Sequence, residues 1–493
     1  MLTTQKNRFS HLLENLLYIA EIKNSSLAKA LQYDVSYISK WINGRKLPAE
    51  RNRKKILSCI SHAIVSQCSA AGLRDLYDNY RVSTPTALEK VIYDNLEAEY
   101  NYVIDTKQTY GTTVPPETTF QPELTPSQYI MKMHHPVLRR VSNLHIMAQI
   151  DLLSLMHEHR LQIVQNHLRY DEYRDYPDVH FSLMIDLAES KINYDYDPIF
   201  LIKMIADMVR IDFHLYAGAQ ASGRMIFTVK DDFMISGMLA DTNRCICITI
   251  SSDTDNCNPV YTSIQDCCTQ EMLLFEKTTM SDMIVYKDYE RSILALNQHW
   301  ILGHVTEHFL PDDLFEELLE QTKQYADIRK NMKTIRYLHK LTKRMLEQTP
   351  VDILIYSNAL FNFAIDNTLD FFDHAIHLTI DQKKRFMQHL LKLNMEKENL
   401  SFKLVYETSG TDFDNDFTQC LFLSDSIAYA RLDTKNGNNN LVIFHQSDMK
   451  QLLHNFFEHF WNDSSLTDDR ENVQNYIKEI LHRVNIIRDL KNN

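Results

Sequence analysis

Glycine is scarce in this chain of 493 residues, which contains only 9. The glycine-dependent phosphate loops G-x-G-x-x-G and G-x-x-x-x-G-K-[ST] are both missing, which argues against dinucleotide-binding folds and P-loop enzymes. No uninterrupted apolar run reaches the roughly 18 residues of a membrane-spanning helix, and the N-terminus has no basic segment followed by a long apolar stretch. We therefore expect no secretion, no membrane partner and a cytoplasmic location.

Cysteine is present, but not in the spacing that most metal sites use. The chain has 8 cysteines and no C-x-x-C pair. Five of them lie within one segment: Cys245, Cys247, Cys257, Cys267 and Cys268. A zinc or redox site is one interpretation in a cytosolic chain, but buried strand thiols fit better because paired ligands are lacking. Alternation along "CICITI" predicts that Cys245 and Cys247 share a strand face, and we expect neither a metal nor a cofactor.

Acidic residues outnumber basic ones, and the formal net charge is −13. This charge is unevenly distributed. Residues 1–66 contain eleven lysines and arginines against four acidic residues, which gives +7, so the remaining chain carries −20. A basic N-terminal segment attached to an acidic body suits phosphate contacts by that segment alone.

One short stretch has the clearest functional pattern, "LAKALQYDVSYISKWINGRKLP" at 27–48. Leu27, Ala28 and Leu31 have helical spacing, and Asp34 is placed to cap a second helix. In that second helix, four apolar residues are predicted to face inward: Val35, Ile38, Trp41 and Ile42. Four others are predicted to face outward near its N-terminal end: Ser36, Tyr37, Ser39 and Lys40.

The stretch ends in "NGRKLP", where Gly44 fits a helix C-cap and Pro48 prevents continuation. Together with "LAKAL" and "S-x-I-S-K-W", it resembles the Xre and Cro/C1-type helix-turn-helix repressors. Two positions depart from that family: Gln32 stands where glycine is usual, and Ile42 stands where glutamate is frequent. The resemblance implies a recognition helix that reads base edges in the DNA major groove. A helical protein-contact module with the same geometry is the alternative.

The resemblance also assigns roles to individual side chains. It implies that Ser36, Tyr37 and Lys40 face bases, with Ser39 on the same outward face. It implies that Asn43, Arg45 and Lys46 contact phosphates. These seven residues are the predicted DNA-binding site.

The rest of the chain predicts a multidomain protein, with an all-α head followed by a helical connector and an α/β body. A Thr-rich stretch with Pro115, Pro116, Pro122 and Pro126 indicates a linker. After it, the order strand, helix, strand, hairpin, strand, helix occurs twice, with a Ser-Gly turn in each copy, which predicts a duplication. The predicted parts are a head (1–70), a helix plus linker (71–128), a helical segment (129–177), a first α/β repeat (178–285), a helical connector (286–349) and a second α/β repeat with a C-terminal helix (350–493).

The end of the second repeat, "NNNLVIFHQSDMKQLLHNFFEHFW" at 438–461, has asparagine, a strand and a helix ending in F-x-x-x-[FW]. Together with "LFLSD", it resembles the phospholipase D superfamily, whose nucleophile motif is H-x-K-x-x-x-x-D. The histidine and lysine of that motif are missing from both copies: Thr418 and Cys420 stand before Asp425, and Arg224 and Ile226 stand before Asp231. The resemblance therefore implies a domain that has lost phosphodiester chemistry and senses an effector.

The sequence "HVTEH" fits the H-x-x-E-H motif of inverted zinc peptidases. On a helix, His304 and His308 would lie one turn apart and share a zinc ion, with Glu307 as general base. The glycine-rich flanks of that family and a third ligand are missing, so histidines with surface or core roles are the favoured interpretation.

We interpret the chain as a transcription regulator without catalytic residues. Its head would bind double-stranded DNA, and its acidic body would sense a small-molecule or peptide effector and set the geometry of a homodimer. The final helix, about 468–489, has an apolar stripe that suits either a dimer seam or, preferably, docking on the body. The alternatives are a DNA-targeted zinc hydrolase and a protein-interaction module without sequence-specific DNA binding.

Overall fold

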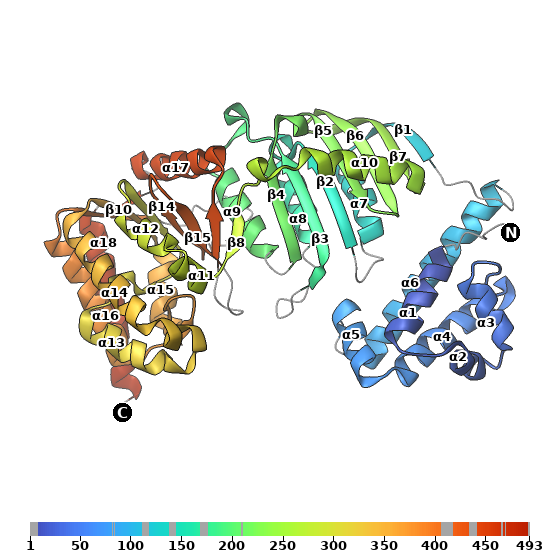
Figure 1. The fold of residues 1–493 in the computed structure, drawn as a ribbon, viewed down its shortest axis with the longest axis horizontal. Coiled ribbons are helices and arrows are strands. Elements are labelled where there is room, and N and C mark those ends of the chain that lie inside the picture. Colours follow the sequence, from blue (N-terminus) through green and yellow to red (C-terminus); the bar gives the residue numbers. More distant parts are fainter. Residues whose placement is uncertain are drawn as a thin grey trace.

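The computed structural model describes residues 8–80, 82, 84–110, 118–137, 144–167, 176–208, 211–405, 418–432, 441–464, 467–468 and 470–491. N-terminal helices are followed by a mixed α/β body with two large sheets, as the sequence predicts (Figure 1). Within these residues, no helix combines the length and apolarity needed to cross a bilayer.

Six helices form an N-terminal bundle with an apolar core of its own. The long helix α6 packs against α1 and α4. It does so through Leu88, Ile92 and Leu96, which are fully buried and recur every four residues, so they lie on one face. The bundle comprises α1 (Arg8–Ile19), α2 (Asn24–Leu31), α3 (Val35–Ile42), α4 (Arg53–Gln67), α5 (Ala70–Tyr80) and α6 (Pro85–Tyr110).

The first sheet has the strand order β1-β7-β6-β5-β2-β3-β4. Strands β2, β3 and β4 are parallel, and β5, β6 and β7 form an antiparallel meander that begins beside β2. The strands are β1 (Thr118–Leu124), β2 (Leu144–Ile150), β3 (Tyr176–Ile185), β4 (Ile211–Ala217), β5 (Arg224–Val229), β6 (Phe233–Asp241) and β7 (Arg244–Ser251). The helices are α7 (Pro126–Val137), α8 (His157–His167), α9 (Asp197–Asp207) and α10 (Thr254–Cys267).

Helices cover both faces of this sheet. Met147 packs with Tyr261 of α10, whereas its neighbours Ile146 and Ala148 belong to the main core together with Tyr129 of α7. Successive side chains of a strand point to opposite faces, so α7 and α10 lie on opposite sides of the sheet.

The second sheet has the order β17-β13-β10-β9-β14-β15-β16-β8. Strands β9, β10 and β13 are parallel, and β14, β15 and β16 form a meander that begins beside β9. Its strands are β8 (Glu276–Thr278), β9 (Gln298–Leu302), β10 (Val351–Tyr356), β13 (Leu400–Val405), β14 (Cys420–Leu423), β15 (Ala428–Arg431), β16 (Leu441–Phe444) and β17 (Thr467–Asp468), and β11 (Thr368–Asp370) pairs separately with β12 (Ala375–His377). The helices are α11 (Met280–Val285), α12 (Asp288–Leu294), α13 (Asp312–Gln321), α14 (Ala326–Gln348), α15 (Ser357–Asp366), α16 (Ile380–Glu396), α17 (Ser447–Asn462) and α18 (Arg470–Lys491).

The two sheets share one topology. The order β4-β3-β2-β5-β6-β7 in the first corresponds to β13-β10-β9-β14-β15-β16 in the second, with the same strand directions. A helix follows the last strand in each, α10 after β7 and α17 after β16. Asp231 and Asp425 both lie in the turn of the first hairpin. The Ser222-Gly223 turn is described, with Gly223 at φ +67°, whereas the predicted turn at 409–410 and the asparagines at 438–440 lie outside the described residues.

Three segments differ from the predicted organisation. Strand β2 lies in the predicted helical segment 129–177, and β9 lies in the predicted connector 286–349. Both are short apolar runs beside helical patterns, where periodicity does not separate a buried strand from a helix. Strand β1 lies in the predicted linker and pairs with β7. It contains Pro122, which an edge strand tolerates because one side of it needs no ladder hydrogen bond. Residues 111–117, with Pro115 and Pro116, lie outside the described part of the chain.

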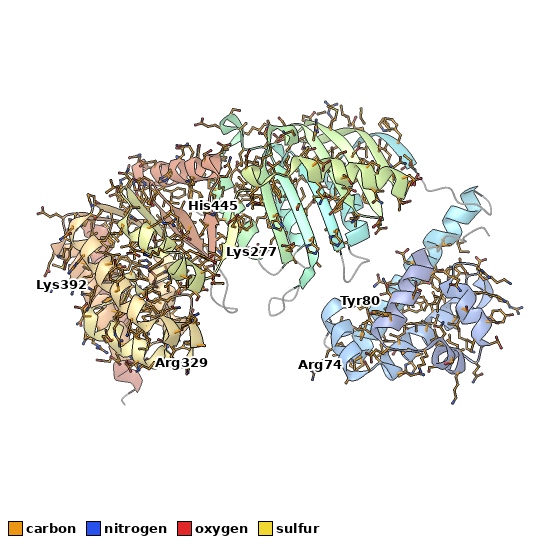
Figure 2. The ribbon with its side chains drawn as sticks, viewed as in Figure 1. Arg74, Tyr80, Lys277, Arg329, Lys392 and His445 are labelled. Carbon is orange, nitrogen blue, oxygen red and sulfur yellow. The ribbon has the colours of Figure 1, made fainter. Side chains whose placement is uncertain are left out.

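The two sheet units meet through a shared core and several polar contacts. Asn455 of α17 donates to the Tyr194 hydroxyl at 3.0 Å, and His459 lies 2.6 Å from Asp195. Lys277 of β8, labelled in Figure 2, donates from its ammonium group to the Ile211 carbonyl at 2.6 Å.

Helix α18 docks on the second unit. It packs against α15, α16 and β13, and the apolar residues of its stripe are buried: Val473, Ile477, Ile480 and Val484. Of the two predicted roles for this stripe, the structure therefore shows docking within the chain.

Candidate nucleic-acid interface

Helices α2 and α3 have eight residues each and are joined by the three-residue turn Gln32-Tyr33-Asp34. Gln32 has φ 57° and ψ 38°, a left-handed conformation that glycine adopts most easily. This backbone requirement gives a physical reason for the glycine usual at this position in the family that the stretch resembles. The Gln32 side chain is exposed, so it meets no steric obstacle inside the bundle.

Asp34 caps helix α3, as predicted. Its carboxylate accepts a hydrogen bond from the Ser36 backbone N–H at 2.8 Å. Hydrogen bonds from the side chain and backbone of Ser36 lower the pKa of Asp34. The cap therefore satisfies one of the backbone donors left open at the start of the helix.

The inner face of α3 is anchored by Ile38, Trp41 and Ile42, all of which are buried. The Trp41 carbonyl accepts a hydrogen bond from the buried Ser10 hydroxyl of α1 at 2.5 Å. Val35 was predicted to face inward but is 45% exposed. It occupies the first position of α3, and spacing gives the direction of a side chain without showing whether a neighbour reaches it.

The outer face of α3 carries the four predicted groove residues. Ser36 and Tyr37 are exposed, and Ser39 and Lys40 are partly exposed. The Lys40 ammonium group lies 5.4 Å from the centre of the Tyr37 ring, within the range of a cation–π contact. The Tyr37 ring also meets Tyr33 edge-on, with centroids 5.9 Å apart. The aromatic ring is thus held between the turn and a cation.

The three predicted phosphate contacts, Asn43, Arg45 and Lys46, are all exposed directly after α3. The chain turns there through Gly44 at φ +69°, and the Lys46 N–H bonds back to the Lys40 carbonyl at 3.2 Å. Asn43 donates from its side chain to Ser39 at 3.3 Å. The structure therefore brings all seven predicted residues together on α3 and the turn that follows it.

The turn is connected to the rest of the bundle. The Tyr100 hydroxyl of α6 donates to the Pro48 carbonyl at 2.8 Å. Arg53 of α4 donates to Asn101 at 2.7 Å, so α4 and α6 are also joined by side chains. These contacts position the loop after α3 without using any of its exposed cations.

The predicted DNA-binding site does not include the other basic residues of the bundle. Among the described residues of the bundle, seven more lysines and arginines are exposed: Lys23, Lys29, Arg51, Lys54, Lys55, Arg74 and Lys90. A charge count includes them, but their positions on the surface follow only from the packing of the helices.

The H-x-x-E-H residues do not lie on one helix, as the alternative interpretation of a shared zinc ion requires. His304 lies in the segment after β9, and Glu307 and His308 belong to a 3₁₀ turn, Glu307–Phe309. His304 contacts the Thr418 carbonyl at 2.5 Å and Asp370 at 3.2 Å. The zinc alternative therefore lacks its helix, because the chain leaves β9 in an irregular segment. The burial of His308 fits the favoured interpretation of a histidine with a core role.

Glu307 and His308 belong instead to a buried polar network centred on Arg431 of β15. Two guanidinium nitrogens of Arg431 donate to the two carboxylate oxygens of Glu307, each at 2.7 Å, and one also donates to Asp370 at 3.1 Å. Burial raises the pKa of Glu307, but the charge and hydrogen bonds of Arg431, together with His308, bring it below its ordinary value. His308 lies 3.1 Å from the Tyr289 hydroxyl, and burial lowers its pKa to about 4.

The cysteine segment also differs from its prediction. Cys245 is buried, whereas Cys247 is exposed and has φ 55°, at an irregularity in the pairing of β6 and β7. The expected common face of Cys245 and Cys247 is wrong, because the irregularity interrupts the alternation. Among the described residues, no group of three or more His, Cys, Asp or Glu side chains is arranged to hold a metal ion.

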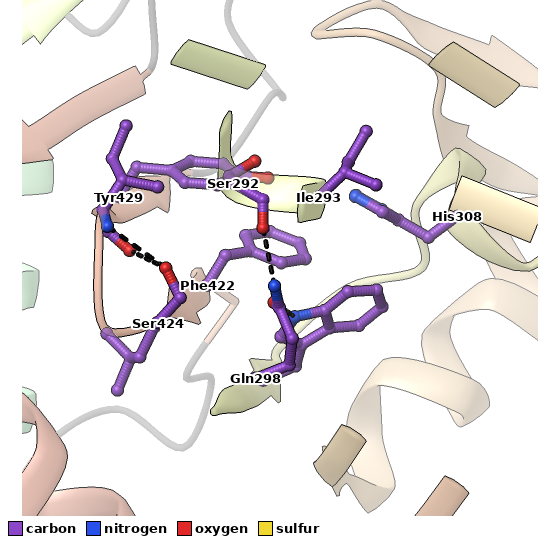
Figure 3. A pocket seen from close by; sticks show the side chains of 10 residues that line it. Ser292, Ile293, Gln298, His308, Phe422, Ser424 and Tyr429 are labelled. Carbon is purple, nitrogen blue, oxygen red and sulfur yellow. Dashed lines mark hydrogen bonds between the residues drawn. The ribbon is translucent and has the colours of Figure 1, made fainter. Parts of the chain in front are cut away.

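A small pocket lies in the second unit, between α12, β9 and the β14–β15 hairpin (Figure 3). Its lining includes Gln298, whose side chain donates to the Ser292 carbonyl at 2.6 Å and accepts from Trp300 at 2.9 Å. Its volume is about 10 Å³, which is room for about one water molecule and far below the roughly 300–1,000 Å³ of typical small-molecule sites. This pocket does not identify an effector.

Comparison of the chain with protein-family models and with curated proteins finds no match in either. The interpretation of α2 and α3 therefore depends on their residues and geometry.

Proposed function

We propose that this protein is a sequence-specific DNA-binding transcription regulator, in which α2 and α3 act as a helix-turn-helix and α3 enters the major groove. The observation that carries the proposal is the form of α3. Its inner face is anchored by Trp41, its start is capped by Asp34, and its outer face is polar. A recognition helix needs this combination, because rigid anchoring lets a few exposed side chains reach base edges in one register.

Two kinds of contact are proposed for the seven residues. Ser36, Tyr37 and Lys40 face bases, with Ser39 beside them, since hydroxyl and ammonium groups can bond base edges in the major groove. Asn43, Arg45 and Lys46 contact phosphates, which positions the helix without reading sequence.

The charge distribution supports this division. The segment 1–66 carries +7 and the rest of the chain −20. An acidic body is repelled by the phosphate backbone, so this distribution favours binding through the head.

For the body, we propose an effector-sensing and dimer-forming role without catalysis. The shared topology of the two sheets supports a duplicated, phospholipase D-like domain. The catalytic histidine and lysine of that family are replaced by Arg224 and Ile226 in the first copy and by Thr418 and Cys420 in the second, which supports the loss of its chemistry. An assay with a chromogenic phosphodiester tests this proposal. We expect no turnover above buffer, and turnover that copurifies with the protein contradicts it.

Selection from a randomised duplex library with the full chain tests DNA binding. We expect enrichment of a two-fold symmetric site with half-sites about one helical turn, or a multiple of one turn, apart, because a homodimer presents two copies of α3. An enriched site without two-fold symmetry contradicts the homodimer but not sequence-specific DNA binding. No enrichment by the folded chain contradicts sequence-specific binding and favours a protein-interaction role.

A further inference from the structure

Helix α14 carries a positive surface on an otherwise acidic body. Its 23 residues, Ala326–Gln348, include seven lysines and arginines and two acidic residues, which gives a formal charge of +5. The chain beyond residue 66 has a formal charge of −20. The positive charge of α14 is therefore a local concentration that opposes the charge of its surroundings.

Part of this charge is neutralised within the fold. Arg336 pairs with Glu316 at 2.9 Å, and Lys343 pairs with Asp312 at 2.5 Å, so both cations are directed toward α13. The remaining cations of α14 are exposed and have no acidic group within 4 Å among the described residues: Arg329, Lys330, Lys333, Lys340 and Arg344. Figure 2 labels Arg329 at the start of this helix.

Four of these cations follow one side of the helix. At 3.6 residues per turn, Lys333, Tyr337, Lys340 and Arg344 project within about 60° of one another around the axis, with Lys330 beside them. The buried residues lie on the opposite side: Ile328, Ile335, Leu338, Thr342 and Met345. We call Lys330, Lys333, Lys340 and Arg344 the basic stripe. It extends over about 21 Å at a rise of about 1.5 Å per residue.

One aromatic ring interrupts the stripe. Tyr337 is 48% exposed, and its hydroxyl donates to Glu290 of α12 at 2.8 Å. This bond fixes the ring and occupies the Glu290 carboxylate, so the outer side of α14 combines cations with a held aromatic surface.

We propose that the basic stripe is a second phosphate-binding surface for double-stranded DNA, separate from α3. Its length of about 21 Å matches the rise of about six base pairs at 3.4 Å each, so several cations can follow one backbone. An anionic membrane fits less well, because a surface-bound helix inserts its apolar face into lipid, and the apolar face of α14 is buried in the core. This proposal rests on the proposed function in one respect: binding of α3 to DNA would bring the body close to the duplex.

A pair of matched triple variants of the full chain tests this surface. The stripe variant is K333E/K340E/R344E. The control variant, K230E/K392E/K478E, makes the same charge change at exposed lysines elsewhere on the body. Binding is measured over a salt series on a duplex that extends several turns beyond the selected site. The steepness of the salt dependence is the slope of the logarithm of the binding constant against the logarithm of the salt concentration. Each lost phosphate contact lowers its magnitude by about 0.9. We therefore expect a decrease of about 2.7 for the stripe variant, which loses three contacts, and little change for the control.

A second background separates this inference from the proposed function. In the head variant K40A/R45A/K46A, we expect weak salt-dependent binding to random duplex, which is lost when the stripe triple is added and kept with the control triple. One outcome is that the wild type enriches no sequence from the duplex library while the stripe triple still abolishes this weak binding to random duplex. That result contradicts sequence-specific recognition by α3 but supports the basic stripe as a phosphate-binding surface.

Equal effects of the stripe and control triples on DNA overturn the inference. If polyglutamate binding then distinguishes the two triples, the stripe recognises an acidic polypeptide instead. The neutral variant K333Q/K340Q/R344Q, whose thermal unfolding midpoint is compared with that of the wild type, shows whether the effect comes from lost contacts or from unfolding of the charge-reversed protein. We expect it to lower the steepness of the salt dependence as the charge-reversed triple does, and a wild-type salt dependence contradicts the proposal.

Discussion

Lys40 and Arg45 are five residues apart, yet the structure gives them different surroundings. Lys40 lies on α3 beside the Tyr37 ring, only partly exposed, whereas Arg45 is exposed in the turn after the helix. A side chain held on a rigid helix can distinguish bases, while one in an exposed turn meets the backbone of any duplex. The proposed function therefore predicts different effects for the two residues.

We expect Lys40→Ala to weaken binding to the selected site by about 1–3 kcal/mol and to relax its sequence preference, because a base contact is lost. Arg45→Ala should weaken specific and random duplexes alike and lower the steepness of the salt dependence by about 0.9. Equilibrium titrations on both duplexes at several salt concentrations measure these effects. An equal loss on both duplexes for Lys40→Ala contradicts its role in reading bases.

His308 predicts a pH dependence of stability. Its pKa is lowered by burial from 6.5 to about 4, so the unfolded chain binds a proton between these values more readily than the folded chain. Stability therefore falls as pH decreases from about 6.5 to 4, by about 3 kcal/mol from this residue. Glu307 has a lowered pKa and contributes in the same direction.

Denaturant unfolding at several pH values measures the contribution of His308. We expect His308→Gln to reduce the loss of stability between pH 6.5 and 4, since glutamine does not titrate. The matched variant at an exposed histidine, His377→Gln, should keep the wild-type slope. Identical slopes for the three proteins contradict the assignment to His308.

At the scale of elements, the ends of helices and strands determine how side chains are presented. The cap at Asp34 and the left-handed turn residue Gln32 set the direction in which α3 leaves α2. In the second unit, β15 brings Arg431 beside Glu307 and Asp370 in a buried site. Both arrangements predict measurable losses of stability.

Asp34→Ala removes the cap of α3. We expect a loss of about 0.5–2 kcal/mol in the stability of the bundle and weaker binding to every duplex, because the start of the helix frays. Asp34→Ser, which keeps a capping oxygen, should restore most of both. Chemical denaturation followed by far-UV circular dichroism makes the measurement, and equal stability of the alanine and serine variants contradicts the cap.

Arg431→Met leaves the buried carboxylate of Glu307 without its cation and leaves Asp370 with His304 as its remaining charged partner. We expect a loss of about 3–5 kcal/mol, because an uncompensated buried charge is costly. Arg291→Met is the matched control, since Arg291 pairs with Asp288 on the surface and such pairs contribute at most about 1 kcal/mol. Similar unfolding midpoints for the two variants would show that the network contributes little.

At the scale of the whole molecule, the two sheet units repeat one topology but differ in what surrounds it. The second unit has a long helical insertion between β9 and β10 that contains α13 and α14. The first unit has only α8 between the corresponding strands β2 and β3 among its described residues. The proposed second DNA surface therefore belongs to an insertion and not to the repeated part.

Sequence alone determined the features that depend on neighbouring residues. The helical spacing of α2, the cap at Asp34 and the glycine turn at Gly44 were predictable, because each is set within a few residues by local backbone geometry. The outward face formed by Ser36, Tyr37, Ser39 and Lys40 followed from helical periodicity. The choice of Asn43, Arg45 and Lys46, which lie after the helix, came from the family resemblance. The order of strand, helix, strand, hairpin, strand and helix in each predicted repeat could also be predicted, since turn residues separate those apolar runs.

Tertiary structure decided what depends on residues far apart in the chain. Strands β2 and β9 are recognisable only by their pairing, because short apolar runs fit a buried helix equally well. Glu307 of the H-x-x-E-H sequence contacts Arg431, which lies more than a hundred residues away, so local spacing could not reveal this partner. The charge of α14 can be counted in the sequence, but which of its cations remain unpaired depends on where α13 packs.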